Sequence, residues 1–406
     1  MILKDTLQII VRSQKKDLAT LDYGVERENL TAIDLSLPFA ILLTGIRRCG
    51  KSTLLRQLTQ RVANYYYFNF EDTRAINFSV GDFQKLDETF REEYGPTDLY
   101  FFDEIQDVPQ WELFVRTMLD KRQRFVITGS NASLMSKELG TRLTGRHLKY
   151  EIFPFSYREM LAFNHKSPDL ASFEEYLRKG GFPDFLKYQN AGILRELFAD
   201  IVERDIVVRH RLRNAKIVKE MALYLLTNVG NEFSYTTLKQ MFHLGSTNSA
   251  IAFVSYFEDS YLLFVVPKFD YSLKKQAINP KKIYSVDNGL SSVNSVSFSS
   301  DTGRMLENAV FGHLRRHYIE IFYFKGEGEC DFLIRDQRKI IAAIQVCYEL
   351  TEDNKDRELT GLVEALQQFN LPKGLIVTFK QDDRFTIEGR EIQVCPAWRW
   401  MSNPSF

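Results

Sequence analysis

The stretch that most constrains this fold is AILLTGIRRCGKSTLLRQL, residues 40–58, where an apolar run changes into glycine, arginine and lysine and then into a leucine repeat. The spacing Gly45-x-x-x-x-Gly50-Lys51-Ser52 fits a phosphate-binding P-loop, whose backbone N–H groups surround a polyphosphate while the lysine reaches the terminal phosphates. Such a loop follows a strand and opens a helix, and FAILLT and STLLRQLTQRV supply both. We therefore predict that these residues contact the nucleotide: Gly45, Ile46, Arg47, Arg48, Cys49, Gly50, Lys51, Ser52 and Thr53. The Ser52 hydroxyl is also expected to bind Mg²⁺.

A second predicted strand, DLYFFDEIQ at residues 98–106, ends in two adjacent carboxylates. Asp103 is expected to hold Mg²⁺ through water, and Glu104 to polarise the water that attacks the γ-phosphate. The acidic pair favours a hydrolase over many nucleotide kinases, which need no water-activating carboxylate. The alternative is a strand that ends in a solvated acidic turn.

Three more buried strands are predicted at residues 65–72, 124–134 and 147–156, with helices between them. This alternation predicts an α/β fold with a parallel, doubly wound sheet whose ligands lie at the carboxyl ends of the strands. In this class of fold a polar side chain at the tip of the 124–134 strand lies between the acidic pair and the γ-phosphate, and Ser130 and Asn131 are the candidates. Both residues also fit a cap for the following helix, ASLMSKEL.

The order of the P-loop, FFDEIQ, ITGSNASL, RLTGR and FPFSYREM resembles the AAA-superfamily ATPases of bacteria and archaea that join such a core to an uncharacterised C-terminal domain. The resemblance covers nearly the whole chain and implies ATP as the nucleotide. This choice of base rests on the resemblance alone, because no residue identified in the sequence recognises the base. It also implies an arginine in the LTGR element that stabilises γ-phosphate charge, with Arg146 as the first candidate and Arg142 as the second. Each arginine also fits a surface ion pair. The predicted catalytic set is thus Lys51, Glu104, Asn131 and Arg146.

Four parts are predicted along the chain: a P-loop ATPase core at residues 1–156, a helical lid at 157–214, a winged-helix segment at 215–290 and a final domain at 291–406. The lid is broken by the turn RKGGFPDF and carries a basic stretch, VERDIVVRHRLRN, from which Arg204 is the candidate to reach a phosphate. The alternative for this stretch is a solvated basic helix face.

Three short helices and a hairpin between residues 215 and 290 fit the winged-helix plan, and the resemblance points the same way. The third helix would offer its N-terminal residues to double-stranded DNA, and the hairpin would add a basic wing. These residues are Ser246, Thr247, Asn248 and Ser249 on the helix, and Lys268, Lys274, Lys275, Lys281 and Lys282 on the hairpin. Many winged helices contact only proteins, so a protein partner or a second copy of the chain is the alternative.

The final domain carries LENAVFGHLRR, ECDFLIRD and KIIAAIQVCYEL, an order that resembles the PD-(D/E)XK nuclease-like fold. Position by position, the helix glutamate is Glu307 and the hairpin aspartate is Asp331. The Glu-x-Lys pair of that family falls at Gln345 and Cys347. Because an amide and a thiol replace a carboxylate and an ammonium, we predict a folded domain without nuclease activity.

The amino-acid composition limits the classes of partner and the compartment that we expect for this chain. Lys and Arg together number 53, as do Asp and Glu, so no whole-molecule field drives the chain onto nucleic acid or an anionic membrane. Four scattered cysteines, no signal-peptide pattern and no long apolar run predict a cytoplasmic protein without a membrane partner. The preferred function is an ATPase that couples Mg²⁺-dependent hydrolysis to a partner. The alternatives are a DNA-binding module with nucleotide-gated binding and little turnover, or an ATP-dependent nuclease.

Overall fold

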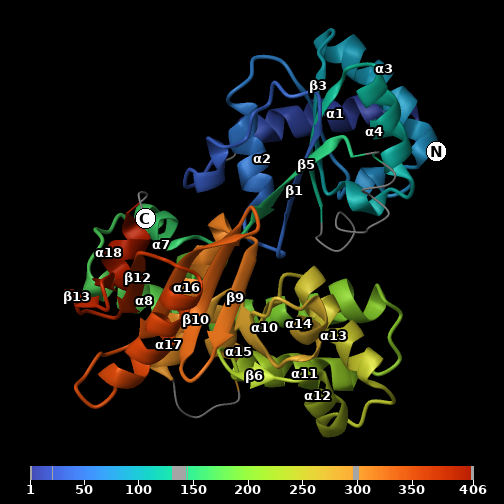
Figure 1. The fold of residues 1–406 in the computed structure, drawn as a ribbon. Coiled ribbons are helices and arrows are strands. Elements are labelled where there is room, and N and C mark those ends of the chain that lie inside the picture. Colours follow the sequence, from blue (N-terminus) through green and yellow to red (C-terminus); the bar gives the residue numbers. More distant parts are fainter. Residues whose placement is uncertain (1, 21, 130–142, 144, 296–300, 404–406) are drawn as a thin grey trace. The chain divides into compact units, whose positions relative to one another are not determined.

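The computed structural model describes residues 2–20, 22–129, 143, 145–295 and 301–403. The chain forms two compact units, Met1–Phe153 and Pro154–Phe406, drawn in blue to teal and in green to red in Figure 1. Each unit is described by itself below. The finer division of the second unit into lid, winged-helix and nuclease-like parts stays a prediction.

The first unit contains a parallel sheet in the strand order β2-β3-β4-β1-β5. The strands are β1 (Ala40–Gly45), β2 (Tyr66–Asn69), β3 (Leu99–Asp103), β4 (Arg124–Thr128) and β5 (His147–Ile152). All five lie within the predicted strand regions, and the predicted α/β fold with a parallel-sheet core is confirmed. Because the strands run in one direction, their carboxyl ends meet at one edge, where the P-loop begins.

Helices cover both faces of this sheet. They are α1 (Lys4–Thr20), α2 (Lys51–Thr59), α3 (Phe83–Tyr94) and α4 (Trp111–Asp120), with short 3₁₀ turns η1 (Glu28–Leu30), η2 (Thr73–Ala75), η3 (Val80–Asp82) and η4 (Ile105–Asp107). Figure 1 shows α2 on one side of the strands and α3 with α4 on the other. The second side is packed with aromatic rings, among them Tyr66 stacked on Phe90 at 4.8 Å and Tyr100 stacked on Phe125 at 4.8 Å. This rigid core holds the strand ends in place.

The second unit starts with helices, as predicted for residues 157–213. They are α7 (Tyr157–Asn164), α8 (Leu170–Lys179), α9 (Pro183–Tyr188), α10 (Ala191–Asp200) and the π-helix η5 (Ile201–Val208). The Gly-Gly turn after α8 is required by packing, because a Cβ on Gly180 would lie 2.2 Å from Asp287 Oδ1 and one on Gly181 would lie 2.1 Å from the Phe155 carbonyl. The Asp287 carboxylate accepts a hydrogen bond from the Gly181 N–H at 2.6 Å.

Next come α11 (Ala215–Thr227), β6 (Glu232–Phe233), α12 (Tyr235–Met241), α13 (Thr247–Asp259), β7 (Leu263–Pro267), α14 (Leu273–Ile278) and β8 (Lys281–Ser285). The three strands form an antiparallel sheet in the order β6-β8-β7. The three helices and the β7–β8 hairpin match the predicted elements, and the sequence did not indicate α14 within the hairpin connection.

The chain ends with a six-stranded mixed sheet in the order β13-β14-β12-β11-β10-β9. Its elements, with the preceding helix, are α15 (Asn288–Asn294), α16 (Thr302–His317), β9 (Glu320–Lys325), β10 (Glu329–Asp336), β11 (Lys339–Cys347), α17 (Lys355–Gln368), β12 (Lys373–Thr378), β13 (Asp383–Ile387), β14 (Arg390–Pro396) and α18 (Ala397–Ser402). Leucines of α17 pack on one face of this sheet against Leu333 and Ile376. The predicted helix and the two predicted strands are observed as α16, β10 and β11, and the sequence did not indicate β9 between α16 and β10.

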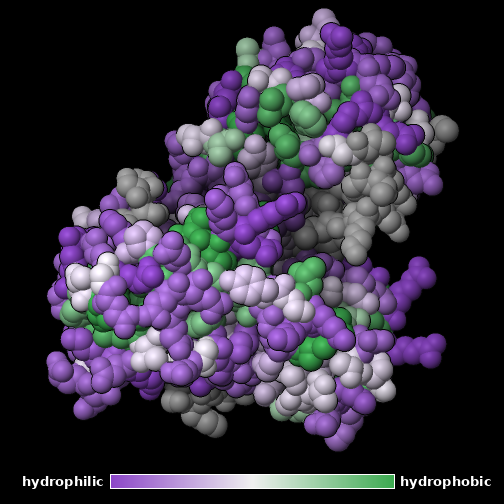
Figure 2. Space-filling view, viewed as in Figure 1, coloured by the Kyte–Doolittle hydropathy of each residue, from purple (hydrophilic) through white to green (hydrophobic). Residues whose placement is uncertain are grey.

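The face drawn in Figure 2 is mainly hydrophilic, with small hydrophobic areas between the polar side chains. Within the described ranges, no helix has the length and apolar character needed to cross a bilayer.

Candidate nucleotide-binding site

The P-loop connects β1 to α2 through two glycines with positive φ. Gly45 has φ +147°, and a Cβ there would lie 2.0 Å from the Ile152 carbonyl oxygen. Gly50 has φ +100°, and a Cβ there would lie 2.7 Å from Arg27 Nη1. Both positions therefore exclude a side chain, by backbone conformation and by space. The glycines let the loop turn tightly, so that its N–H groups and the N-terminus of α2 converge on one place.

Lys51 is the first residue of α2 and is 5% exposed. Its ammonium donates hydrogen bonds to the carbonyls of Gly45 and Ile46, each at 3.1 Å. A buried ammonium without a carboxylate partner in these contacts is suited to an anionic ligand, because phosphate oxygens would complete its hydrogen bonding. The side chains of Ile46 and Cys49 are buried, so we expect these residues to offer only backbone N–H groups.

Asp103 links the P-loop to the neighbouring strands. Its Oδ1 accepts a hydrogen bond from the Ser52 hydroxyl at 3.1 Å and another, very short, from the Thr128 hydroxyl. The Tyr67 hydroxyl donates to Oδ2 at 3.4 Å. Burial raises the pKa of Asp103, while the nearby Lys51 charge acts in the opposite direction. A hydroxyl and a carboxylate side by side are ligands of the kind Mg²⁺ takes beside phosphate oxygens, so the residues fit this ion.

Glu104 leaves the strand in a left-handed conformation, with φ +54°. Its backbone N–H donates to Thr128 Oγ1 at 3.0 Å, and its carboxylate accepts from Gln106 at 2.8 Å. Thr128, the last residue of β4, is thus bonded to both members of the acidic pair. The sequence analysis placed the polar tip of this strand at Ser130 and Asn131 and missed Thr128. The sequence contains a signal for Thr128, because this polar residue directly follows the apolar run FVI.

Arg27 is a second residue that the sequence did not indicate. It is 4% exposed, and its guanidinium donates to the carbonyls of Cys49 at 2.6 Å and Phe153 at 2.7 Å. Its backbone N–H donates to Gln57 on α2. Arg27 therefore supports the P-loop from behind and ties it to the end of β5. No motif marks it, because its partners are backbone carbonyls distant in sequence.

The predicted role of Arg146 does not fit this chain's own site. Its guanidinium pairs with Asp120 at 2.7 Å, and its carbonyl accepts from the N–H of Ala40 at the start of β1. Arg146 therefore lies at the amino-terminal edge of the sheet, whereas the P-loop lies at the carboxyl edge, about 20 Å away along a six-residue strand. Ser130, Asn131 and Arg142 lie outside the described residues.

The predicted DNA-contacting lysines divide into three groups. Lys268, directly after β7, is half-buried, and its backbone forms a bridge with Tyr323 of β9. Lys274 and Lys275 on α14 are exposed, as a phosphate contact requires. Lys281 and Lys282 are 8% and 3% exposed, so their prediction as wing contacts is wrong. Both lysines are buried by the packing around β8. The Lys281 ammonium donates to the carbonyls of Ala277 and Asn279, and the Lys282 ammonium lies among carboxylates, including Asp331.

The remaining predicted residues of the second unit have these positions. The Ser246 hydroxyl caps α13 by accepting from the Ser249 N–H at 3.1 Å, and Arg204 is exposed on η5. Glu307 and Asp331 are brought close together around Lys282, and burial, followed by the Asp331 charge, raises the pKa of Glu307. Gln345 accepts from the Asp331 N–H at 3.2 Å.

Cys347 points elsewhere, with its thiol donating to the Glu349 carbonyl at 3.2 Å. Burial raises its pKa to about 11, so it is a neutral thiol at neutral pH. It supplies no charge where the nuclease pattern has a lysine.

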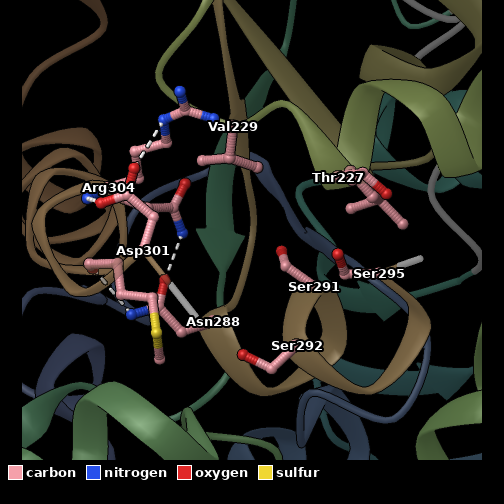
Figure 3. Close-up of a pocket in the computed structure, with 11 residues that line it drawn as sticks. Thr227, Val229, Asn288, Ser291, Ser292, Ser295, Asp301 and Arg304 are labelled. Carbon is pink, nitrogen blue, oxygen red and sulfur yellow. Dashed lines mark hydrogen bonds and ion pairs between the residues drawn. The ribbon is translucent and has the colours of Figure 1, made fainter. Parts of the chain in front are cut away.

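A cavity of about 320 Å³ with a mixed polar and apolar lining lies among residues of the second unit alone. Figure 3 shows the Asp301–Arg304 ion pair on one side of it and Thr227 with Ser295 on the other. The lining includes none of the residues that the sequence analysis selected.

The uncharacterised protein MJ1544 of Methanocaldococcus jannaschii is 34% identical over 393 residues, which cover 88% of this chain and 87% of MJ1544. The chain belongs to the MJ1544 family. An uncharacterised protein of Haemophilus influenzae is 29% identical over 388 residues, 89% of this chain and 94% of that protein.

Residues 38–161 match the family model of an AAA domain, so this part of the MJ1544-family chain is an AAA-type P-loop ATPase domain. Residues 170–298 and 302–400 match two domains of unknown function, DUF8612 and DUF4143. The first of these models spans most of the predicted lid and winged-helix segments together.

Among solved structures, AMPPCP-bound DnaA from Aquifex aeolicus is similar, with a TM-score of 0.28 and 15% identity over 64% of this chain and 90% of that one. The Aeropyrum pernix ORC1 protein in complex with DNA has a TM-score of 0.30 and 14% identity over 76% of this chain and 94% of that one. Scores this low do not establish a shared overall fold.

Proposed function

We propose that this protein binds ATP with Mg²⁺ at the P-loop and hydrolyses it. The observation that carries the proposal is the hydrogen-bonded series from Ser52 through Asp103 and Thr128 to the Glu104 N–H, beside the buried ammonium of Lys51. The series joins the ends of β3 and β4 to the first turn of α2 at one edge of the sheet. A nucleotide would be bound and aligned there by groups that are already positioned.

Each residue has a distinct role in this proposal. The loop N–H groups and Lys51 bind the phosphates, and Ser52 with Asp103 would hold Mg²⁺, which screens the charge of the phosphate oxygens. Thr128 orients the Asp103 carboxylate and fixes the backbone of Glu104 through its N–H. Glu104 accepts a proton from the attacking water.

Two variants test this function. Lys51→Ala should weaken nucleotide binding, measured by titration with a fluorescent ATP analogue. Glu104→Gln should keep binding and lose turnover, because an amide keeps the shape but does not accept the proton. Hydrolysis by Glu104→Gln at the parent rate would remove the assigned role of Glu104, and an unchanged affinity in Lys51→Ala would remove the site itself.

A second proposal concerns DNA. The element order α11-β6-α12-α13-β7-β8 and the sheet order β6-β8-β7 support a winged helix, with α13 as the recognition helix and α14 in the wing. The exposed Lys274 and Lys275 support contact with phosphates. Hydrolysis would then be coupled to a DNA or protein partner through the second unit, and a second copy of the chain is one such partner.

The DNA proposal is tested by the double variant Lys274→Ala and Lys275→Ala. It should bind duplex DNA more weakly at every sequence, with a salt dependence reduced by roughly one unit of slope per lost contact. Lys373→Ala is the control, because this exposed lysine lies on β12, outside the segment. If the parent does not bind DNA at low salt, the DNA proposal is wrong.

The last part of the chain is proposed to have a nuclease-like fold. The order α16-β9-β10-β11-α17-β12 supports it, since a helix, a three-stranded antiparallel meander and a helix before a parallel strand form the core of that fold. We expect no cleavage of DNA with Mg²⁺ or Mn²⁺, because Gln345 and Cys347 lack the charges that the reaction needs.

A further inference from the structure

A buried lysine lies at the centre of the carboxylate cluster in the nuclease-like part. The Lys282 ammonium is 2.8 Å from Asp331 Oδ1, 3.1 Å from Glu307 Oε1 and 2.7 Å from Glu329 Oε1. The Lys282 side chain is 4% exposed. It enters from strand β8, whereas its three partners come from α16 and β10. Three carboxylates from two elements therefore converge on one cation of the chain itself.

The other polar groups around the cluster are also paired. Tyr284 donates to Glu307 Oε1 at 2.6 Å, and the Val346 N–H donates to Asp331 Oδ2 at 2.9 Å. Gln345 accepts from the Asp331 N–H and donates to Glu358 at 2.7 Å, so its amide faces two partners of its own. Both oxygens of Asp331 and one oxygen each of Glu307 and Glu329 are thus engaged by protein donors. Among the described residues, no group of three His, Cys, Asp or Glu side chains has an arrangement that could hold a metal ion.

We propose that the Lys282 ammonium takes the place of the divalent cation that a PD-(D/E)XK enzyme would hold, so that this cluster is a metal-independent clamp. The proposal rests on the nuclease-like fold proposed above. The ammonium is a compact point charge with three donors, and here it meets three carboxylates. The clamp fastens strand β8 of the three-stranded sheet to α16 and β10. The residues do not fit a metal ion while Lys282 is in place.

The adjacent lysine provides a matched comparison. Lys281 is also buried on β8, but its ammonium bonds to two backbone carbonyls. Removal of Lys281 would take a donor from those two carbonyls, but every carboxylate of the cluster would keep its cation. Removal of Lys282 would leave three neighbouring carboxylates without this cation, and among the described residues only Glu329 would keep another, Lys325 at 3.6 Å. Their present arrangement could not hold a metal ion, so a divalent ion would bind them only once the side chains turn toward it.

The test compares Lys282→Met with Lys281→Met and the parent, by Mn²⁺ titration calorimetry and by thermal unfolding with Mn²⁺ or EDTA. Methionine keeps most of the apolar stem of lysine, so the change is mainly one of charge. We expect the parent and Lys281→Met to unfold at temperatures that Mn²⁺ does not change. Lys282→Met should unfold several degrees lower in EDTA, recover with Mn²⁺, and bind Mn²⁺ at least tenfold more tightly than the parent. Adding Asp331→Asn to Lys282→Met should abolish that binding.

Three results would overturn the proposal. One is Mn²⁺ binding by the parent that Asp331→Asn removes, because the native cluster would then be a metal site. The second is a folded Lys282→Met that binds no Mn²⁺, and the third is a Lys282→Met as stable as the parent in EDTA. If Lys282→Met does not fold, Lys282→Arg takes its place; it keeps a cation and should fold without metal. The Mn²⁺ titration of the parent then tests the proposal, because Mn²⁺ binding that Asp331→Asn removes would contradict it. None of these measurements uses ATP, so they are independent of the proposed hydrolysis.

Discussion

The Ser52 hydroxyl donates a 3.1 Å hydrogen bond to Asp103 Oδ1 and so joins the P-loop to the end of β3, 51 residues further along the chain. Parallel pairing makes this contact possible, because β1 and β3 flank β4 and end at the same edge of the sheet. The bond holds the two oxygens expected to be nearest Mg²⁺ at a fixed separation. Thr128, on the strand between them, completes the arrangement.

Replacing Thr128 by valine should slow hydrolysis while nucleotide affinity stays close to that of the parent. Valine keeps the shape but leaves the Asp103 carboxylate and the Glu104 N–H without their shared partner. A lost hydrogen bond to a charged group costs about 1.5–3 kcal/mol, so turnover should fall by roughly 10- to 100-fold. Thr128→Ser keeps the hydroxyl and should retain most of the activity. Steady-state ATP hydrolysis measures both, and parent-like turnover in Thr128→Val would contradict the role of Thr128.

Gly50→Ala should abolish nucleotide binding. The added Cβ would lie 2.7 Å from Arg27 Nη1, at a φ of +100° that side chains rarely adopt. Gly95→Ala is the control, because Gly95 also has a positive φ, +72°, but no heavy atom lies within 4 Å of its added Cβ. Each variant should lose about 1 kcal/mol of stability to backbone strain. Only Gly50→Ala should lose nucleotide affinity, and equal affinity losses in both would show that the contact with Arg27 does not matter.

Arg146→Ala should hydrolyse ATP at the parent rate, because Arg146 lies at the opposite edge of the sheet and pairs with Asp120. The pair is partly exposed, so its loss should cost at most about 1 kcal/mol. Asp120→Ala should give the same result, since each variant removes the same ion pair. A strong loss of turnover in Arg146→Ala alone, growing with protein concentration in the parent, would show that this arginine serves the site of a neighbouring copy.

Glu258→Gln should stabilise the protein in alkaline buffer. Burial raises the pKa of Glu258 from 4.5 to about 7, so its stabilising contribution is complete below about pH 4.5 and is lost as the pH rises through 7. Glutamine is neutral at every pH and keeps an oxygen to accept from the Val265 N–H, now bonded at 3.1 Å. The variant should match the parent near pH 5 and exceed it by on the order of 2 kcal/mol near pH 8.5. Urea unfolding at both values measures this, and an equal difference at the two pH values would contradict it.

Much of the first unit could be predicted because its signals are local. An apolar run followed by Gly45, Gly50, Lys51 and Ser52 specifies a strand, a tight phosphate-binding turn and a helix within one short stretch. Asp103 likewise ends an apolar strand. The carboxyl ends of parallel strands share an edge, so the proximity of Ser52 and Asp103 follows from the strand pattern together with the rule for parallel sheets.

The sequence by itself determined the strands of the parallel sheet and the order of the main helices and strands as far as β11, apart from α14 and β9. Only the tertiary structure decided which residues meet: Thr128 with the acidic pair, Arg27 behind the P-loop, Arg146 at the far edge, and Lys282 among three carboxylates. From the sequence alone a lysine is expected to lie exposed to solvent. Whether it is buried depends on partner side chains that lie distant in the chain. Lys282 is buried because Glu307, Glu329 and Asp331 offset the cost of removing its charge from water, and the packing of α16 and β10 on β8 brings them together.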